Sequence, residues 1–258
     1  MFGLAGVDFP QDELRLSGVP AALHLTGPSR IVNDSFVALQ AGTQRSWGVV
    51  VVAGSGAVAA GRNTNGKTFR TMGLGSTMGD WGSATDVSEA AVTAVAEQYT
   101  GMGPETALSE RLREAAGCAS VLELLEGVSR ERIDGTIFAP RVVEAAEVGD
   151  AVARGILERA GRGLGRSAVV VVRKLGMEEM EFDLVLSGAM FRGASRILQS
   201  VLEAVVAQAA PRATPVRLDA PPVIGAALLA MELTGLPLRE EVQARLGAEA
   251  GDALAGRS

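Results

Sequence analysis

The chain has 258 residues, 47% of them hydrophobic and 21% charged, so it can bury a substantial core in one large domain or two smaller ones. A net charge of −6 and an aromatic content of 4% argue against nucleic-acid binding, which favours basic faces and aromatic platforms. One cysteine and one histidine argue against an intramolecular disulfide, a cysteine or histidine metal site and a histidine-based catalytic triad.

The first hundred residues predict short strands, short helices and a β-meander. Strands are expected at 1–7 and 30–32, each followed by a helix, and the second helix runs from Asn33-Asp34 to residue 41. Residues 47–53, 57–60 and 67–71 read as three consecutive strands. The turns between them are Gly54-Ser55-Gly56 and Asn63-Thr64-Asn65-Gly66.

The rest of the chain reads as mainly helical, with two further strands. A glycine-rich loop at 72–82 leads to a helix capped by Ser83, and apolar spacing predicts helices over 105–116, 120–126, 150–174, 196–209 and 221–233. Strands are expected at 180–186 and 216–218, and a terminal helix after residue 236. The order predicts an α/β fold with mixed sheets and a domain boundary near 98–106, where glycine and proline interrupt the helices.

Gly54-Ser55-Gly56 follows a hydrophobic strand, as the dinucleotide-binding fingerprint does. The fingerprint fails, because its third glycine is replaced by Ala59 and because the next element is a strand instead of a helix. Two readings stay open: an ordinary hairpin turn, or a turn whose backbone N–H groups meet an anion.

Three other stretches could carry chemistry. Asn33-Asp34 stands where a strand ends and a helix begins, and two readings stay open: either residue caps the helix, or the Asp34 carboxylate accepts a proton from a substrate hydroxyl. Asp80 closes the glycine-rich loop, either as a capping acid or as a ligand-binding group. Ser187-Gly188-Ala189 ends a buried strand, where small residues let a flat ligand lie against the backbone.

These stretches belong to an ordered set along the chain. Its members are Gly3-Leu4-Ala5-Gly6-Val7-Asp8, Val32-Asn33-Asp34 with Ala38 and Gly42, Ala53-Gly54-Ser55-Gly56 with Gly61-Arg62-Asn63 and Gly66, Met78-Gly79-Asp80 with Gly82-Ser83, Leu186-Ser187-Gly188, and Ala220-Pro221-Pro222-Val223-Ile224-Gly225-Ala226. The ordered set resembles the BadF/BadG/BcrA/BcrD-type ATPase and N-acetylglucosamine kinase family. That resemblance implies an actin-like ATPase fold, in which two RNase H-like domains close over ATP and substrate. We expect a sugar-side domain at 1–100 and a nucleotide-side domain at 101–258.

The resemblance also implies an enzyme that phosphorylates N-acetylglucosamine or a related sugar with ATP and Mg²⁺, and it assigns no residue to a metal. Asp34 resembles the catalytic base. The positions that resemble sugar-binding residues are Asn33, Asp34, Gly75 and Asp80. The positions that resemble nucleotide-binding residues are Gly54, Ser55, Gly56, Ser187, Gly188, Ala189 and Gly225. The expected partners are ATP and a small sugar, with a homodimer left open, in a cytoplasmic protein without membrane or nucleic-acid contacts.

Family members begin with a strand and hairpin carrying Asp-Gly-Gly-Gly-Thr, which does not precede Met1 here. We therefore expect the first domain to lack its initial strands and the activity to be impaired. Leu74 replaces a usual aromatic and Trp81 a usual glutamate, which bears on sugar specificity. One alternative is a non-catalytic or decayed relative. Another is an activator ATPase of a radical dehydratase. Such a protein holds an iron–sulfur cluster with several cysteines, and Cys118 alone provides too few.

Overall fold

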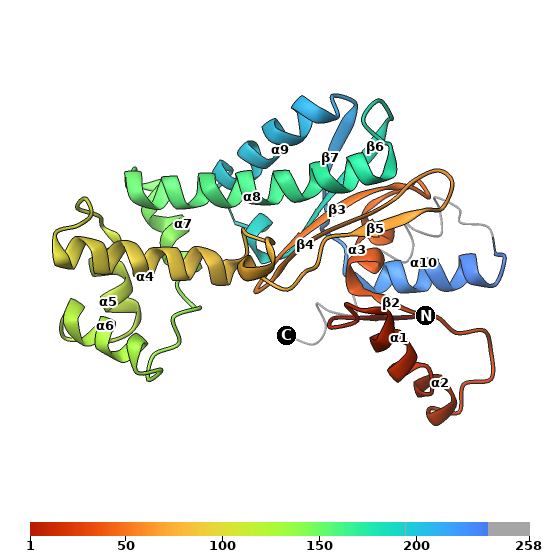
Figure 1. Cartoon of the computed structure of the whole chain (residues 1–258), viewed down its shortest axis with the longest axis horizontal. Helices are drawn as coiled ribbons and strands as arrows, with labels where there is room; N and C mark the ends of the chain where they lie inside the picture. Colours follow the sequence, from red (N-terminus) through yellow and green to blue (C-terminus); the bar gives the residue numbers. More distant parts are fainter. Residues whose placement is uncertain (194, 237–258) are drawn as a thin grey trace.

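The computed structural model describes residues 1–193 and 195–236 (Figure 1). The chain begins with β1 (Phe2–Leu4), α1 (Pro10–Leu16), α2 (Val19–Ala22), β2 (Ile31–Asn33) and α3 (Asp34–Gly42). β1 and β2 pair in parallel, with Phe2 opposite Ile31 and Leu4 opposite Asn33. This register places Asn33 and Asp34 at the carboxyl end of the strand pair. The helix predicted after residue 236 lies outside the described residues.

A five-stranded mixed sheet forms the centre of the molecule, in the order β5-β4-β3-β6-β7. β3 (Gly48–Ala53), β4 (Ala57–Arg62) and β5 (Thr68–Arg70) form an antiparallel meander, which confirms the sequence prediction. β6 (Phe182–Ser187) pairs in parallel with β3, and β7 (Ala213–Arg217) pairs in parallel with β6. Pro215 is tolerated in β7 because this strand lies at the edge of the sheet.

Helices and two short 3-10 turns complete the described chain. They are η1 (Ser76–Met78), α4 (Ala84–Thr100), α5 (Leu108–Ala115), α6 (Val121–Ser129), α7 (Ala139–Glu147), α8 (Ala151–Leu175), η2 (Ala189–Phe191), α9 (Ile197–Ala209) and α10 (Val223–Leu233). In Figure 1, α4–α7 extend beyond one end of the sheet, while β1, β2, α1 and α2 lie below it, on the side of α3 and α10. No helix among the described residues has both the length and the hydrophobicity needed to cross a bilayer.

Both faces of β3 are buried, so its sequence is a continuous valine run instead of an alternating one. Val49 and Val51 belong to the large core that includes α8 and α9, whereas Val50 packs in a smaller cluster with α3 residues and Val185. The sheet therefore lies between a layer made by α8 and α9 on one face and helix α3 on the other.

The domain boundary predicted near residues 98–106 lies inside this central unit. β3, β4 and β5 precede it, β6 and β7 follow it, and all five strands form one sheet. Gly101, with a φ of 76°, ends α4, so the glycine and proline signals mark a helix end within the helical layer. The division into a domain at 1–100 and a domain at 101–258 stays a prediction.

Candidate active site

The turn between β3 and β4 lies against the start of α4. The N–H of Ala84 donates to the carbonyl of Gly54 at 2.8 Å, and Thr85 Oγ1 donates to the carbonyl of Ser55 at 2.9 Å. Ser55 and Gly56 are exposed at the tip, and a Cβ added to Gly54 or Gly56 would meet no atom within 4 Å. Packing therefore requires neither glycine, and the positive end of a 17-residue helix lies beside an open turn.

β6 ends in a turn that requires glycine. Gly188 has a φ of 109°, and a Cβ there would lie 2.2 Å from the carbonyl oxygen of Ala53 at the end of β3. Ser187 is buried and lies opposite Val52 in the parallel pairing of β3 and β6. The predicted adenosine turn, 187–189, is thus adjacent to the turn at 54–56. Both lie at the carboxyl ends of neighbouring parallel strands, where α/β sheets bind ligands.

A mainly apolar cavity of about 340 Å³ opens beside these turns. Ala84 at the start of α4 and Ala189 after the β6 turn both line it. Ser195 also lines it, and its buried Oγ has no hydrogen-bond partner within the described part of the chain. The other lining residues are Ala139, Pro140, Val143, Leu157, Met190, Gly193 and Leu198, together with the acidic Glu144 and Glu147. The volume and lining suit a flat aromatic base, with the Ser195 hydroxyl available to its polar edge.

Asn33, and not Asp34, caps α3. Asn33 Oδ1 accepts hydrogen bonds from the N–H of Ser35 at 3.0 Å and from its Oγ at 2.5 Å. Asp34 is the first helical residue and is exposed. Nearby protein still removes enough water to raise the pKa of its carboxyl. The N–H of Ser35 lowers this pKa, the charge of Asp8 raises it, and Arg70 lowers it, with a net rise.

Three polar side chains join the start of α3 to the end of β5. Asn33 Nδ2 donates to the carbonyl of Val7 and to Asp8 Oδ1, each at 3.2 Å. Arg70 Nη1 lies 3.2 Å from Asp8 Oδ1, and Arg70 Nη2 donates to the Asp8 carbonyl at 2.7 Å. Arg70 Nη1 also donates to the carbonyl of Met72 at 2.7 Å. No local sequence pattern pointed to a role for Asp8 or Arg70.

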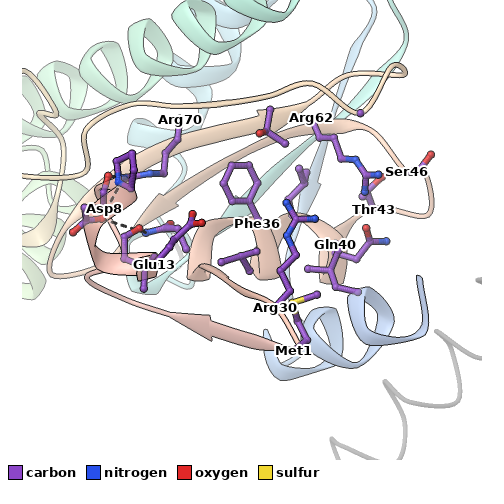
Figure 2. Close-up of a pocket in the computed structure, with 18 of the residues that line it drawn as sticks. Met1, Asp8, Glu13, Arg30, Phe36, Gln40, Thr43, Ser46, Arg62 and Arg70 are labelled. Atoms are coloured by element: carbon purple, nitrogen blue, oxygen red, sulfur yellow. Dashed lines mark hydrogen bonds and ion pairs between the residues drawn. The ribbon is translucent and has the colours of Figure 1, made fainter. Parts of the chain in front are cut away.

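A cavity of about 290 Å³, with a mixed polar and apolar lining, extends from this network along α3. Figure 2 shows Asp8 and Arg70 at one end, Phe36 in the middle, and Thr43, Ser46 and Arg62 at the other end. Arg62 makes a bidentate ion pair with Glu232 of α10, with Nη–Oε distances of 3.0 and 2.7 Å. Partners in the two ion pairs are separated by 62 and 170 positions, which explains why local patterns could not reveal them.

Asp80 orders the glycine-rich loop. Its buried carboxylate accepts a hydrogen bond from the N–H of Gly73 at 2.7 Å. Gly75 lies in the same loop with a φ of 85°, just before η1. These contacts give Asp80 a loop-closing role, and its contact with a sugar stays a prediction, as does that of Gly75.

Ser83 caps α4, as the sequence predicted. Its Oγ accepts the N–H of Asp86 at 3.1 Å, and the Asp86 carboxylate accepts the N–H of Ser83 at 2.9 Å, which completes a capping box. The capping alternative for Asp80 is therefore wrong.

Gly225 lies where α10 crosses α3. A Cβ at this position would lie 1.9 Å from the carbonyl oxygen of Val37 and 2.9 Å from the backbone nitrogen of Ala41. Glycine is therefore needed for the close approach of the two helices. The predicted contact of Gly225 with nucleotide stays a prediction.

Comparisons with known proteins identify the family. The model of the BadF/BadG/BcrA/BcrD ATPase family matches residues 19–230. The chain belongs to this family. It is 30% identical over 191 residues to an N-acetylmuramic acid/N-acetylglucosamine kinase from Clostridium acetobutylicum, covering 73% of this chain and 62% of that protein. It is also 30% identical over 236 residues to an N-acetyl-D-glucosamine kinase from Dictyostelium discoideum, covering 89% of this chain and 74% of that protein.

A solved structure agrees with the fold that family membership implies. A candidate N-acetylglucosamine kinase from Chromobacterium violaceum superposes with a TM-score of 0.61 at 19% identity, covering 88% of this chain and 73% of that one. This likeness confirms the predicted mixed α/β, actin-like ATPase fold. The chain spans less than two thirds of the length of the Clostridium relative.

Proposed function

We propose that the protein transfers a phosphoryl group from ATP to a hydroxyl of N-acetylglucosamine or a related amino sugar. The observation that carries the proposal is the meeting of two glycine turns at the carboxyl ends of β3 and β6. They lie beside the start of α4 and the apolar cavity. The kinases from Clostridium and Dictyostelium support the class of acceptor.

On the nucleotide side, the adenine ring would enter the apolar cavity beside Ala189, and the phosphates would reach the turn at Ser55 and Gly56. The open space above both glycines of that turn allows a phosphate to approach the backbone. Backbone N–H groups and the start of α4 would then neutralise the charge that develops on the phosphate oxygens.

On the sugar side, Asp34 would act as the general base. The sugar hydroxyl oxygen attacks the γ-phosphorus, the bond from that phosphorus to the β–γ bridging oxygen breaks, and ADP leaves. The hydroxyl proton passes to the Asp34 carboxylate and then to solvent. A raised pKa makes this carboxylate a better proton acceptor than an ordinary surface aspartate.

The family resemblance also implies Mg²⁺. Within residues 1–193 and 195–236, no three His, Cys, Asp or Glu side chains converge to hold a metal ion. The activator-ATPase alternative is not favoured either, because Cys118 is the chain's one cysteine and is buried.

The test is steady-state phosphorylation of N-acetylglucosamine by the 258-residue chain and by Asp34→Asn, with ATP affinity measured by calorimetry. Asparagine keeps the shape of the side chain but cannot accept the proton, so kcat should fall by about 10²–10⁴ while ATP affinity is retained. Asp134→Asn is the matched control, since this exposed carboxylate bonds to Thr136 outside the site.

Two results would contradict the proposal. A variant Asp34→Asn that keeps more than about a tenth of the wild-type turnover removes Asp34 from the base role. A wild-type chain that binds ATP but phosphorylates no amino sugar matches the non-catalytic alternative instead.

A further inference from the structure

We propose that Asp8 and Arg70 are positioning residues for Asp34. They tie the start of α3 to the glycine-rich loop and balance the charge beside the carboxylate. The inference rests on the proposed function, because Asp34 is assigned as the base there. It adds two residues that touch neither of the glycine turns.

The first support is the connectivity of the pair. Asp8 accepts a hydrogen bond from Asn33, the residue that caps the helix carrying Asp34. Arg70 binds both the side chain and the carbonyl of Asp8 and, through the same guanidinium, the carbonyl of Met72. Met72 precedes Gly73, whose N–H is held by Asp80. One guanidinium therefore links the base-bearing helix to the loop assigned to the sugar.

The second support is the burial of the pair. The side chains of Arg70 and Asp8 are 12% and 17% exposed, so both charges have lost most of their hydration. In an ion pair so buried, the attraction between the charges roughly offsets the cost of removing them from water. Apolar side chains of similar volume often stabilise a fold at least as much as such a pair does. Stability alone is therefore a weak explanation for charged residues here, whereas their position beside Asp34 gives the charges a use.

The third support is the sign of each charge at Asp34. Two charged groups from neighbouring elements act on this carboxyl: Asp8, from the loop between β1 and α1, and Arg70, from β5. Asp8 raises the pKa of Asp34, and Arg70 lowers it. Removal of Arg70 should therefore raise this pKa further, and neutralisation of Asp8 should lower it. A purely structural defect would not move the pKa in opposite directions.

The experiment measures kcat/KM against pH for the wild type, Asp8→Asn, Arg70→Met and the double variant. The acidic limb reports the pH at which the base becomes protonated. We expect it to move to higher pH in Arg70→Met, to lower pH in Asp8→Asn, and back toward the wild type in the double variant. Each shift should be on the order of 0.5 pH unit, less than direct contact with an opposite charge produces.

Two further variants separate positioning from general damage. Arg70→Lys keeps the positive charge but cannot bind both carbonyls at once, so the acidic limb should stay near that of the wild type while KM for the sugar rises. Arg62→Met breaks the ion pair with Glu232 at the far end of the same cavity, and it should leave the acidic limb in place.

Carbon-13 NMR titration of the Asp34 carboxyl, assigned by its loss in Asp34→Asn, reads the same shifts without turnover. If the carboxyl titrates as expected but Asp34→Asn keeps its turnover, the base assignment fails and the charge balance stands. If the titration is unchanged in both single variants, or moves the same way in both, the inference is overturned whatever the kinetics show. Asp8→Asn is nearly isosteric, so it keeps the test available if Arg70→Met fails to fold.

Discussion

Replacement of Gly225 by alanine should weaken the fold, because two helix backbones meet at this residue. The added Cβ would lie 1.9 Å from the carbonyl oxygen of Val37, whereas real Cβ contacts are essentially never shorter than 3.0 Å. The helices must therefore separate by at least about 1 Å, and neither contact atom is a movable side-chain end. Overpacking of this kind typically costs about 1–3 kcal/mol, which lowers Tm by roughly 2–12 °C for a chain of this size.

The assay is thermal unfolding followed by circular dichroism, with Gly155→Ala as the matched control. Gly155 is exposed within α8, and a Cβ there would meet no atom within 4 Å. Alanine should therefore stabilise this helix by roughly 0.5–1 kcal/mol and raise Tm slightly. If Gly225→Ala melts at or above the wild type while Gly155→Ala behaves as expected, α10 does not cross α3 this closely.

Two further predictions concern capping and pH. Asp86→Ala removes the acceptor for the N–H groups of Gly82 and Ser83, and should cost about 2 kcal/mol or more in urea unfolding; equal stability of Asp86→Ala and the wild type would contradict the capping box. The hydrogen bond from Arg62 holds the pKa of Glu232 below its ordinary value of 4.5. The ionised carboxylate therefore stabilises the folded state at pH values above 4.5, and this stabilisation is lost as the pH falls through the lower pKa of the folded state. Arg62→Met should therefore lower the neutral-pH stability by no more than about 1 kcal/mol and flatten its loss in acid, and an unchanged acid dependence would count against the pair.

Local sequence patterns were sufficient where neighbouring residues decide the structure. The turn signal at 63–66 and the valine run before it predicted the meander, since strand length and turn chemistry are local. Ser83 was identified as a cap because its partner, Asp86, is three residues away. The same reasoning did not separate α7 from the helical block around it, because its first residues, Ala139 and Pro140, carry no polar cap.

Long-range contacts were beyond those patterns. The sequence could not decide which residue of the Asn33-Asp34 pair caps α3. The structure assigns the cap to Asn33, whose side chain accepts from the N–H of Ser35 and donates to the carbonyl of Val7. The pairing of Asp8 with Arg70 joins residues 62 positions apart, and nothing local distinguishes either from an ordinary surface charge. The pairing of β3 with β6 was hidden for the same reason, because it joins residues more than a hundred positions apart.

One helix, α3, connects the candidate base to the nucleotide side through direct contacts along its length. Asp34 begins the helix, Val37 meets α10 at Gly225, and the last residue, Gly42, lies so near β6 that a Cβ would be 2.3 Å from Val185 Cγ1. Two residues beyond Val185, β6 ends at Ser187 and the glycine turn follows. Any shift of α3 against the sheet would therefore change the distance between the base and the phosphate-side turns. The small residues at these crossings, Gly225 and Gly42, help to fix that distance.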